Sequence, residues 1–360
     1  MAIVVERFEE RGGGVEAAAF HLVRELAARD VAVSVVCRVA PARPPSGATL
    51  VELRVSPTWQ PLRLLRFSRQ ATAATARGFD LVHAYARTRH QTLYRCGGGC
   101  HAEYMERVYR RPQLRRLSPR HRAILAIEEA VFRDPAQWIE CNSHHAARTV
   151  ASRYAVPTRR LSVIYNGVDT ERFHPRRRRQ HRERLRASLG LRGPTALFVG
   201  DAFVRKGLDR AIRGLAAGPP DAQLLVAGAG DVARFRALAH GRGVEDRVRF
   251  LGRRPDVEVL HAAADLLVLP TRYDPFANAC LEAMASGLPV ATTPHNGVSE
   301  LLEGGDAGLV IEGDFRAAFE LLADAARLAA RGEAARAIAE AHSWRHHADE
   351  TLALYERVLA

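Results

Sequence analysis

Two carboxylates in the C-terminal half of the chain, Asp274 and Glu282, stand eight residues apart across a predicted helix start. Asp274 is expected in a loop, with Glu282 roughly a turn and a half into the helix, one helical face deeper. The first amides of that helix, near Ala277 and Asn278, have no intrahelical partners, and the helix dipole favours negative charge there. The pattern indicates a site for a phosphate or a sugar hydroxyl. The alternative is an ordinary amphipathic helix between carboxylates, which the uncharged run after Phe276 disfavours.

Two adjacent cations, Arg205 and Lys206, lie in the glycine-flanked segment 200–207, directly after a predicted buried strand. Ligands of α/β proteins bind at the carboxyl edge of a parallel sheet, and paired cations can hold a diphosphate. We therefore predict a diphosphate site at Arg205 and Lys206. A solvated helix start is the alternative for this segment taken alone.

A glycine run, which includes Gly13 and Gly14, separates the opening strand from an amphipathic helix. Glycine lets a backbone approach a ligand closely, and the following helix N-terminus favours an anion. An ordinary strand-to-helix turn explains the run equally well. The sequence is not the dinucleotide pattern G-x-G-x-x-G, so a Rossmann oxidoreductase is disfavoured.

The five cysteines are too few and too scattered for a disulfide framework, and their odd number argues against full pairing. Cys96, Cys100 and His101 lie close together in sequence. The three glycines between the cysteines favour a backbone turn, and no second ligand pair follows, so we expect reduced thiols and no metal.

The chain carries a formal charge of +13, which implies an anionic partner. Seven arginines and no carboxylate occupy residues 107–122, interleaved with apolar residues. Such a segment can lie on an anionic membrane surface or hold a phosphorylated glycan, and residues 59–67 can add to the same face. A solvated basic loop is the alternative. Nucleic acid is not expected, because neither stacking platforms nor a recognised basic fold is present.

Short β-rich runs alternate with helical stretches along the whole chain, which predicts parallel sheets with crossover helices. The polar run 176–186 is interpreted as a linker between two such series. The predicted strands are 3–5, 31–36, 49–55, 80–84, 138–141 and 161–165, then 196–199, 223–227, 248–251, 266–269, 290–292 and 309–311. The predicted helices include 15–29, 232–239, 276–286 and a terminal helix over 343–359.

The first residues run straight into structured sequence without a leader, and no stretch reaches the roughly 20 apolar residues of a membrane-spanning helix. We expect a soluble, cytoplasmic protein that could attach to the inner face of the membrane through its basic segment.

Four phrases together resemble the retaining glycosyltransferases of family 4. They are Tyr165-Asn166-Gly167-Val168-Asp169 with Arg172-Phe173, Arg205-Lys206-Gly207, the run 273–282, and Asn296-Gly297-Val298-Ser299-Glu300. The resemblance covers the C-terminal half fully and the N-terminal half more thinly. It implies an α/β, GT-B fold, in which two Rossmann-like domains with parallel sheets face each other across a cleft. Residues 1–168, joined by a C-terminal helix 343–360, would form the acceptor-side domain, and residues 169–342 the nucleotide-sugar-binding domain.

The resemblance also implies roles for residues of the C-terminal half. Arg205 and Lys206 would grip the donor diphosphate, and Glu282 would bind the nucleotide ribose. Asp274 stands where the family usually has the first glutamate of its E-x7-E motif, and its carboxylate would reach a donor sugar hydroxyl. Further donor contacts are implied for four residues: Arg172, Phe276, Ala277 and Asn278.

Other implied contacts come from scattered loops. Gly13 and Gly14 would approach the donor phosphate, and the loop at Arg254 would add a contact. His101 occupies the place of a cleft histidine near the transferred sugar, although a purely structural histidine is an equal alternative. The block 80–101, the basic insert and the helix around 127–132 make the chain most similar to the lipopolysaccharide core glucosyltransferase I group.

The implied reaction transfers a hexose from a nucleotide sugar, expected to be UDP-glucose, to a glycan or glycolipid acceptor with retention at the anomeric carbon. It needs no cofactor and no metal. A GT-B epimerase or phosphorylase is the rival among enzymes, and a basic nucleic-acid-binding protein is the rival outside them.

Overall fold

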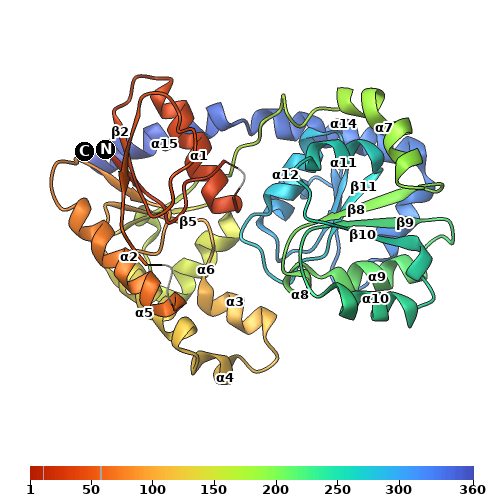
Figure 1. Ribbon diagram of the computed structural model, residues 1–360, viewed down its shortest axis with the longest axis horizontal. Helices are drawn as coiled ribbons and strands as arrows, with labels where there is room; N and C mark the ends of the chain where they lie inside the picture. Colours follow the sequence, from red (N-terminus) through yellow and green to blue (C-terminus); the bar gives the residue numbers. More distant parts are fainter. Residues whose placement is uncertain (11, 57–58) are drawn as a thin grey trace. The chain divides into compact units, whose positions relative to one another are not determined.

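The computed structural model describes residues 1–10, 12–56 and 59–360, which form two compact units. Unit 1 comprises Met1–Gly167 and Trp344–Ala360, and unit 2 comprises Val168–Ser343 (Figure 1). The predicted boundaries after residues 168 and 342 lie within one residue of these limits. Among the described residues, no helix has both the length and the apolar character needed to cross a membrane.

Unit 1 contains a seven-stranded parallel sheet in the order β3-β2-β1-β4-β5-β6-β7. Alternate strand residues face opposite sides, so Ile3 packs with α1 and α15, whereas Ala2 packs with α2. The strands are β1 Ala2–Val4, β2 Val33–Cys37, β3 Ala48–Glu52, β4 Val82–Ala84, β5 Leu93–Cys96, β6 Trp138–Cys141 and β7 Leu161–Val163. The helices are α1 Gly14–Ala27, α2 Gln60–Ala74, α3 His101–Val108, α4 Pro112–Arg116, α5 Pro119–Arg133, α6 His144–Tyr154, η1 Thr158–Arg160 and α15 Trp344–Leu359.

Unit 2 contains a six-stranded parallel sheet in the order β10-β9-β8-β11-β12-β13. The strands are β8 Thr195–Val199, β9 Gln223–Ala227, β10 Val248–Gly252, β11 Leu266–Leu269, β12 Val290–Thr292 and β13 Gly308–Val310. The helices are α7 Arg176–Ser188, α8 Phe203–Lys206, α9 Leu208–Ala217, α10 Val232–His240, η2 Glu245–Arg247, α11 Val257–Ala263, α12 Asn278–Ala285, η3 Gly297–Leu302, α13 Arg316–Glu320, η4 Leu321–Ala323 and α14 Ala325–Ala341. The chain order reverses between β8 and β11, which is the switch point where α/β proteins of this kind bind ligands.

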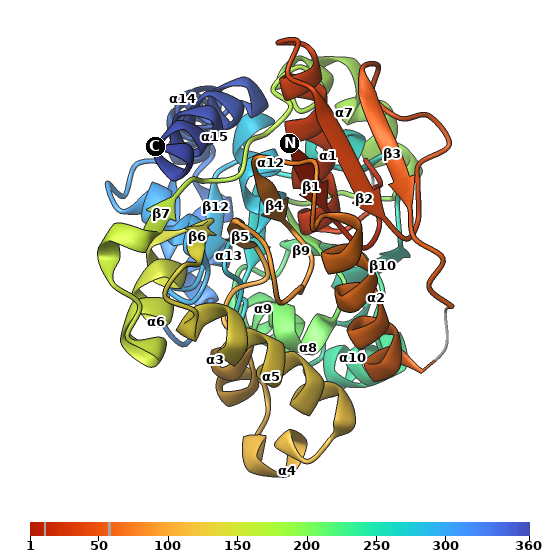
Figure 2. The same ribbon diagram turned by 90° about the vertical axis from the view of Figure 1, so that its left-hand side faces the viewer.

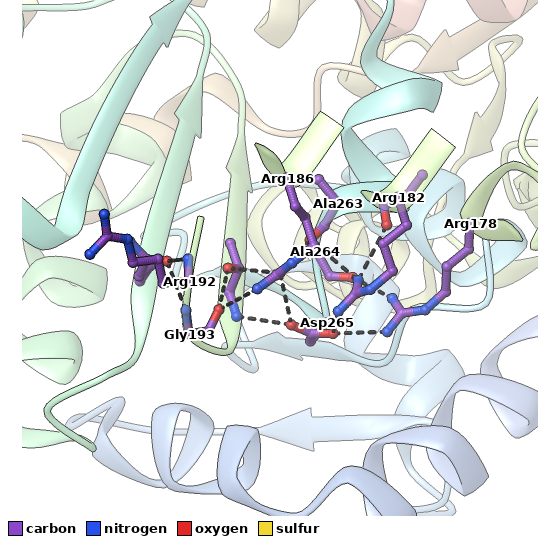
Figure 3. Close-up of polar contacts among 11 residues, drawn as sticks. Arg178, Arg182, Arg186, Arg192, Gly193, Ala263, Ala264 and Asp265 are labelled. Carbon is purple, nitrogen blue, oxygen red and sulfur yellow. Dashed lines mark hydrogen bonds and ion pairs between the residues drawn. The ribbon is translucent and has the colours of Figure 1, made fainter. Parts of the chain in front are cut away.

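The linker prediction for residues 176–186 is wrong, because these residues form most of helix α7, which packs against α11. The helix has no buried residue, so its sequence contains no apolar face from which a helix could be predicted. Its arginines hold it instead, and Figure 3 shows Arg178 and Arg182 reaching Asp265, at Nη2–Oδ1 distances of 2.9 and 2.7 Å. Burial alone would raise the pKa of Asp265, but the arginine charges, with Arg182 first, lower it.

Strand β5 is absent from the predicted strands, because the sequence Leu93–Cys96 carries a charge at Arg95. Inside unit 1 this guanidinium forms an ion pair with Glu140 of β6, and both side chains are almost completely buried. Glu140 also contacts Nε2 of His83 at 3.0 Å, and Nδ1 of His83 is 2.8 Å from the hydroxyl of Tyr355 on α15. The network therefore connects the C-terminal helix to the middle of the sheet. The charge of Arg95 in β5 is paired inside unit 1 and does not face solvent.

Candidate active site

The paired cations of unit 2 converge on one buried carboxylate. Arg205 and Lys206 lie at the end of α8, after β8, and Asp274 lies in the segment that follows β11. Nη1 of Arg205 donates to Oδ2 of Asp274 at 2.9 Å, and Nζ of Lys206 donates to the same oxygen at 2.6 Å. Strands β8 and β11 are neighbours in the sheet, so the topology itself brings these segments together at the switch point.

The short path from β8 to α8 requires two unusual backbone conformations. Gly200 has φ 149°, and Ala202 has φ 56°, a left-handed value that is uncommon for a residue other than glycine. Such strain persists where the surrounding structure enforces it, and it is concentrated at functional sites. Here it turns the chain sharply enough for α8 to carry Lys206 back over the end of the sheet.

Arg205, Lys206 and Asp274 form an ion triad in which the cations keep Asp274 ionised at neutral pH. Burial would by itself raise the pKa of Asp274, but the charges of Lys206 and then Arg205 lower it below its ordinary value. The side chain of Lys206 is 11% exposed, whereas that of Arg205 is 28% exposed. The arrangement concentrates two positive charges at the sheet edge and balances them with one negative charge, so it can accept a further anion.

The start of α12 differs from the predicted one. The helix begins at Asn278 rather than Phe276, and the amide of Ala277 is not unpaired, because it donates to Oδ1 of Asn296 at 3.1 Å. The same oxygen accepts from the amide of Val298 at 3.3 Å, so the side chain of Asn296 caps two turns at once. Any contact between a ligand and the amide of Ala277 therefore requires this bond to break. Phe276 is buried.

Glu282 lies one turn into α12 and is partly exposed. Burial raises its pKa to about 7, Arg172 acts to lower it, and Glu258 acts to raise it. Nη2 of Arg172 donates to Oε2 of Glu258 at 2.8 Å, and its guanidinium lies 5.0 Å from the ring centroid of Phe173. Arg172 is thus engaged by a carboxylate that the sequence interpretation did not include in the site.

The raised pKa of Glu282 predicts a pH dependence of stability. The folded state holds the proton up to about pH 7, and the unfolded carboxyl releases it near its ordinary value of 4.5, so the free energy of unfolding falls as the pH rises between these values. Glu282→Gln should flatten this decline. At about pH 8 it should raise the free energy of unfolding by about 1–2 kcal/mol. This value is less than the free energy equivalent of the whole pKa shift, because the side chain is partly exposed. Urea unfolding across this range measures it.

The matched control for that measurement is Glu356→Gln, which changes an exposed carboxylate of α15. It should leave the pH profile unchanged. A Glu282→Gln profile that parallels the wild type would contradict the assignment of the pH dependence to Glu282.

Three further predicted donor contacts are Arg254 in unit 2 and the glycines Gly13 and Gly14 in unit 1. Arg254, after β10, is paired with Asp256, with Nη2 and Oδ2 2.7 Å apart. Gly13 and Gly14 are exposed at the start of α1. A Cβ at Gly13 would lie 2.6 Å from Oε2 of Glu16, so a carboxylate stands beside the glycine turn.

His101 is the first residue of α3 in unit 1 and is buried. Its Nε2 lies 2.9 Å from Nδ1 of His121, and its ring stacks on Tyr104 at 5.3 Å between centroids. Burial first, then Arg87 and His121, lower its pKa to about 3, so the imidazole is neutral at physiological pH. Its backbone amide donates to Oε2 of Glu128.

Sequence reasoning missed three residues that engage the predicted ones: Glu258, His121 and Glu128. His121 and Glu128 stand seven residues apart, which is a spacing of one helix face, but the helix predicted there lay around 127–132 and did not include His121. For Glu258 no local pattern could reveal that Arg172, far away along the chain, is its partner.

Comparisons with known proteins agree with this architecture. The model described as Glycosyltransferase Family 4 matches residues 12–172, and the model described as Glycosyl transferases group 1 matches residues 193–328. The lipopolysaccharide glucosyltransferase WaaG of Escherichia coli (strain K12) is 31% identical over 264 residues, 71% of this chain and 69% of that protein. The D-inositol 3-phosphate glycosyltransferase of Corynebacterium jeikeium (strain K411) is 32% identical over 245 residues, 62% of this chain and 58% of that protein.

Solved structures show the same fold. A crystal structure of WaaG, a glycosyltransferase involved in lipopolysaccharide biosynthesis, has a TM-score of 0.84 at 24% identity and covers 98% of both chains. Anabaena Alr3699/HepE in complex with UDP and glucose has a TM-score of 0.76 at 20% identity and covers 99% of both chains.

Two α/β units with parallel sheets, the second with paired cations at its switch point, define a glycosyltransferase with the GT-B fold. Within that class the chain belongs to glycosyltransferase family 4, in the group that includes the lipopolysaccharide glucosyltransferase WaaG. The predicted fold class and the family resemblance are thereby confirmed.

Proposed function

We propose that the protein transfers a hexose, with retention at the anomeric carbon, from UDP-glucose to a glycan or glycolipid of the lipopolysaccharide core type. Two relatives support this donor and acceptor, since WaaG is named a lipopolysaccharide glucosyltransferase and the structure of HepE is described as a complex with UDP and glucose. The observation that carries the proposal is the convergence of Arg205 and Lys206 on Asp274 at the switch point of unit 2. A nucleoside diphosphate supplies the anion that these two cations can accept.

The proposed mechanism needs neither a side-chain nucleophile nor a metal. Arg205 and Lys206 stabilise the charge that develops on the departing diphosphate, and a diphosphate oxygen helps to remove the acceptor proton on the same face of the sugar. The second carboxylate oxygen of Asp274, Oδ1, would accept from a sugar hydroxyl, and Glu282 would hold the ribose. Binding both substrates in a reactive orientation supplies much of the rate enhancement.

A screen of UDP-, GDP- and ADP-sugars by thermal unfolding tests the donor. A ligand that binds only the folded state raises its stability in proportion to the logarithm of concentration over Kd, so UDP-glucose should give the largest shift. Proton NMR of the glycoside formed then reports the anomeric configuration. An inverted product, or a larger shift with GDP- or ADP-glucose, would contradict the proposal. A free sugar isomer or a sugar phosphate as product would indicate an epimerase or a phosphorylase.

An anionic membrane surface is the proposed docking partner of residues 107–122. Helix α4 lies at the lower end of unit 1 in both views (Figures 1 and 2), and Leu114, within α4, and Leu117, directly after it, are 59% and 72% exposed among arginines. Trp59, which precedes α2, is 63% exposed. Apolar side chains between cations are typical of surfaces that bind anionic lipid, and such a surface would hold the enzyme on the cytoplasmic face of the membrane.

Sedimentation with phosphatidylserine vesicles measures this docking. Leu117→Asp should weaken binding by about tenfold, because it removes an apolar contact and adds a repelled charge. Leu359→Asp, at an exposed position of α15, is the control and should bind normally. Equal binding to phosphatidylcholine vesicles would contradict the electrostatic part of the proposal.

A further inference from the structure

Helix α5 holds His101 by two separate contacts from one face. His121 and Glu128 stand seven residues apart on this helix, which places their side chains on the same side. The ring of His121 contacts the ring of His101, with 2.9 Å between Nδ1 and Nε2. Glu128 accepts from the backbone amide of His101 and from that of Ala102, the latter at 3.1 Å.

The carboxylate of Glu128 thereby caps the N-terminus of α3 from outside the helix. Its Oε1 also accepts from the hydroxyl of Tyr154 at 2.7 Å, and the residue is 6% exposed. Because a buried carboxylate already occupies the first amides of α3, this helix end is not an anion site. The carboxylate of Glu128 therefore fixes the backbone at His101. The orientation of the imidazole then depends only on the two side-chain torsion angles of His101.

The second contact fixes those torsions. Both His101 and His121 are 5% exposed, and burial, reinforced by neighbouring arginines, lowers the pKa of each ring, so both are neutral. In a pair of neutral imidazoles one nitrogen donates and the other accepts, and either choice uses Nε2 of His101. Nδ1 of His101 makes no hydrogen bond to any residue that the structure describes.

We propose that His121 is a positioning residue that occupies Nε2 of His101 and leaves Nδ1 as the ring atom that meets the substrate. The inference rests on the proposed function together with the role that the family resemblance implies for His101, a place near the transferred sugar. It adds the ring atom of His101 that contacts the substrate, and it adds a residue, His121, whose role is exerted through His101. Since His121 lies in the first turn of α5, the helix that follows the arginine-rich α4, the basic segment 107–122 would itself supply the positioning residue.

A double-mutant cycle tests the positioning role. His121→Leu should lower kcat by about 10- to 100-fold with a less than about threefold change in the donor KM, whereas His121→Asn, whose amide can replace Nδ1, should stay within about threefold of the wild type. In a His101→Ala background, His121→Leu should cost nothing further. His240→Leu, at an exposed histidine of α10, is the control and should be fully active.

The outcomes separate the two proposals. Full activity of His101→Ala would overturn the role of His101 itself. An inactive His101→Ala together with a fully active His121→Leu, or losses that multiply in the double variant, would overturn only the positioning role. Should His121→Leu fail to fold, ¹⁵N spectra of the wild-type imidazoles decide. A single fixed tautomer of His101 from about pH 5 to about pH 9 supports the proposal, and averaged or titrating ring nitrogens overturn it.

Discussion

Replacing Lys206 by alanine should lower kcat/KM for the nucleotide sugar by about 10³-fold, the largest effect expected from a single substitution in this chain. The ammonium is the more buried of the two cations at the switch point, and a charge that stabilises a leaving group in a water-poor site contributes about 3–4 kcal/mol to the transition state. Steady-state kinetics with UDP-glucose measures the change. Arg213→Ala, at an exposed arginine of α9, is the matched control and should be neutral.

Lys206→Arg should also lose most of the activity, although it keeps the charge. A guanidinium is planar and larger than an ammonium, and the side chain of Lys206 is only 11% exposed, with its ammonium 2.6 Å from Oδ2 of Asp274. Lys206 is the only lysine in the sequence, so reductive ¹³C-methylation gives one lysine signal beside that of the N-terminus. UDP should shift this signal. Full activity of either variant, or a signal that ignores UDP, would contradict the assignment of Lys206 to the diphosphate.

The strands of unit 2 were predictable because each is a short apolar run that packs between helices. Strand β11, Leu266–Leu269, is buried throughout and matches its predicted range. Strand β5 and helix α7 were not predictable in the same way, since their charged residues are satisfied by partners distant in sequence, Glu140 for Arg95 and Asp265 for the arginines of α7. The local sequence pattern predicts an element from the periodicity of its apolar residues. Strand β5 and helix α7 depend instead on ion pairs with residues that are distant in sequence.

In the candidate site, too, some features were predictable from the local sequence and others were not. Arg205, Lys206 and Asp274 were identified from their types and their positions after strands, and the structure brings them together. The amide of Ala277 was predicted to be unpaired because helix starts generally lack partners, but Asn296 supplies one. A cap provided by a remote side chain leaves no trace in the local sequence.

Asp274→Asn should lower the free energy of unfolding by about 3–5 kcal/mol in the absence of ligand. It keeps the shape of the side chain but leaves Lys206 and Arg205 without their counter-charge inside the protein. Because the pKa of Asp274 is lowered, its stabilisation is present above the ordinary pKa of an aspartate and is lost as the pH falls, so the two proteins should converge below about pH 4. Asp349→Asn, which breaks an exposed pair with Arg29, should cost under about 1 kcal/mol.

The response of Asp274→Asn to UDP distinguishes a structural ion triad from a diphosphate site. If the diphosphate meets Lys206 and Arg205, it supplies the charge that the variant lacks, so UDP should raise the Tm of Asp274→Asn by more than it raises that of the wild type. Transfer activity should still fall, since the carboxylate that receives the sugar hydroxyl is gone. Equal Tm shifts in the two proteins would mean that UDP binds away from these cations. The proposed donor site would then be wrong even though the triad stabilises unit 2.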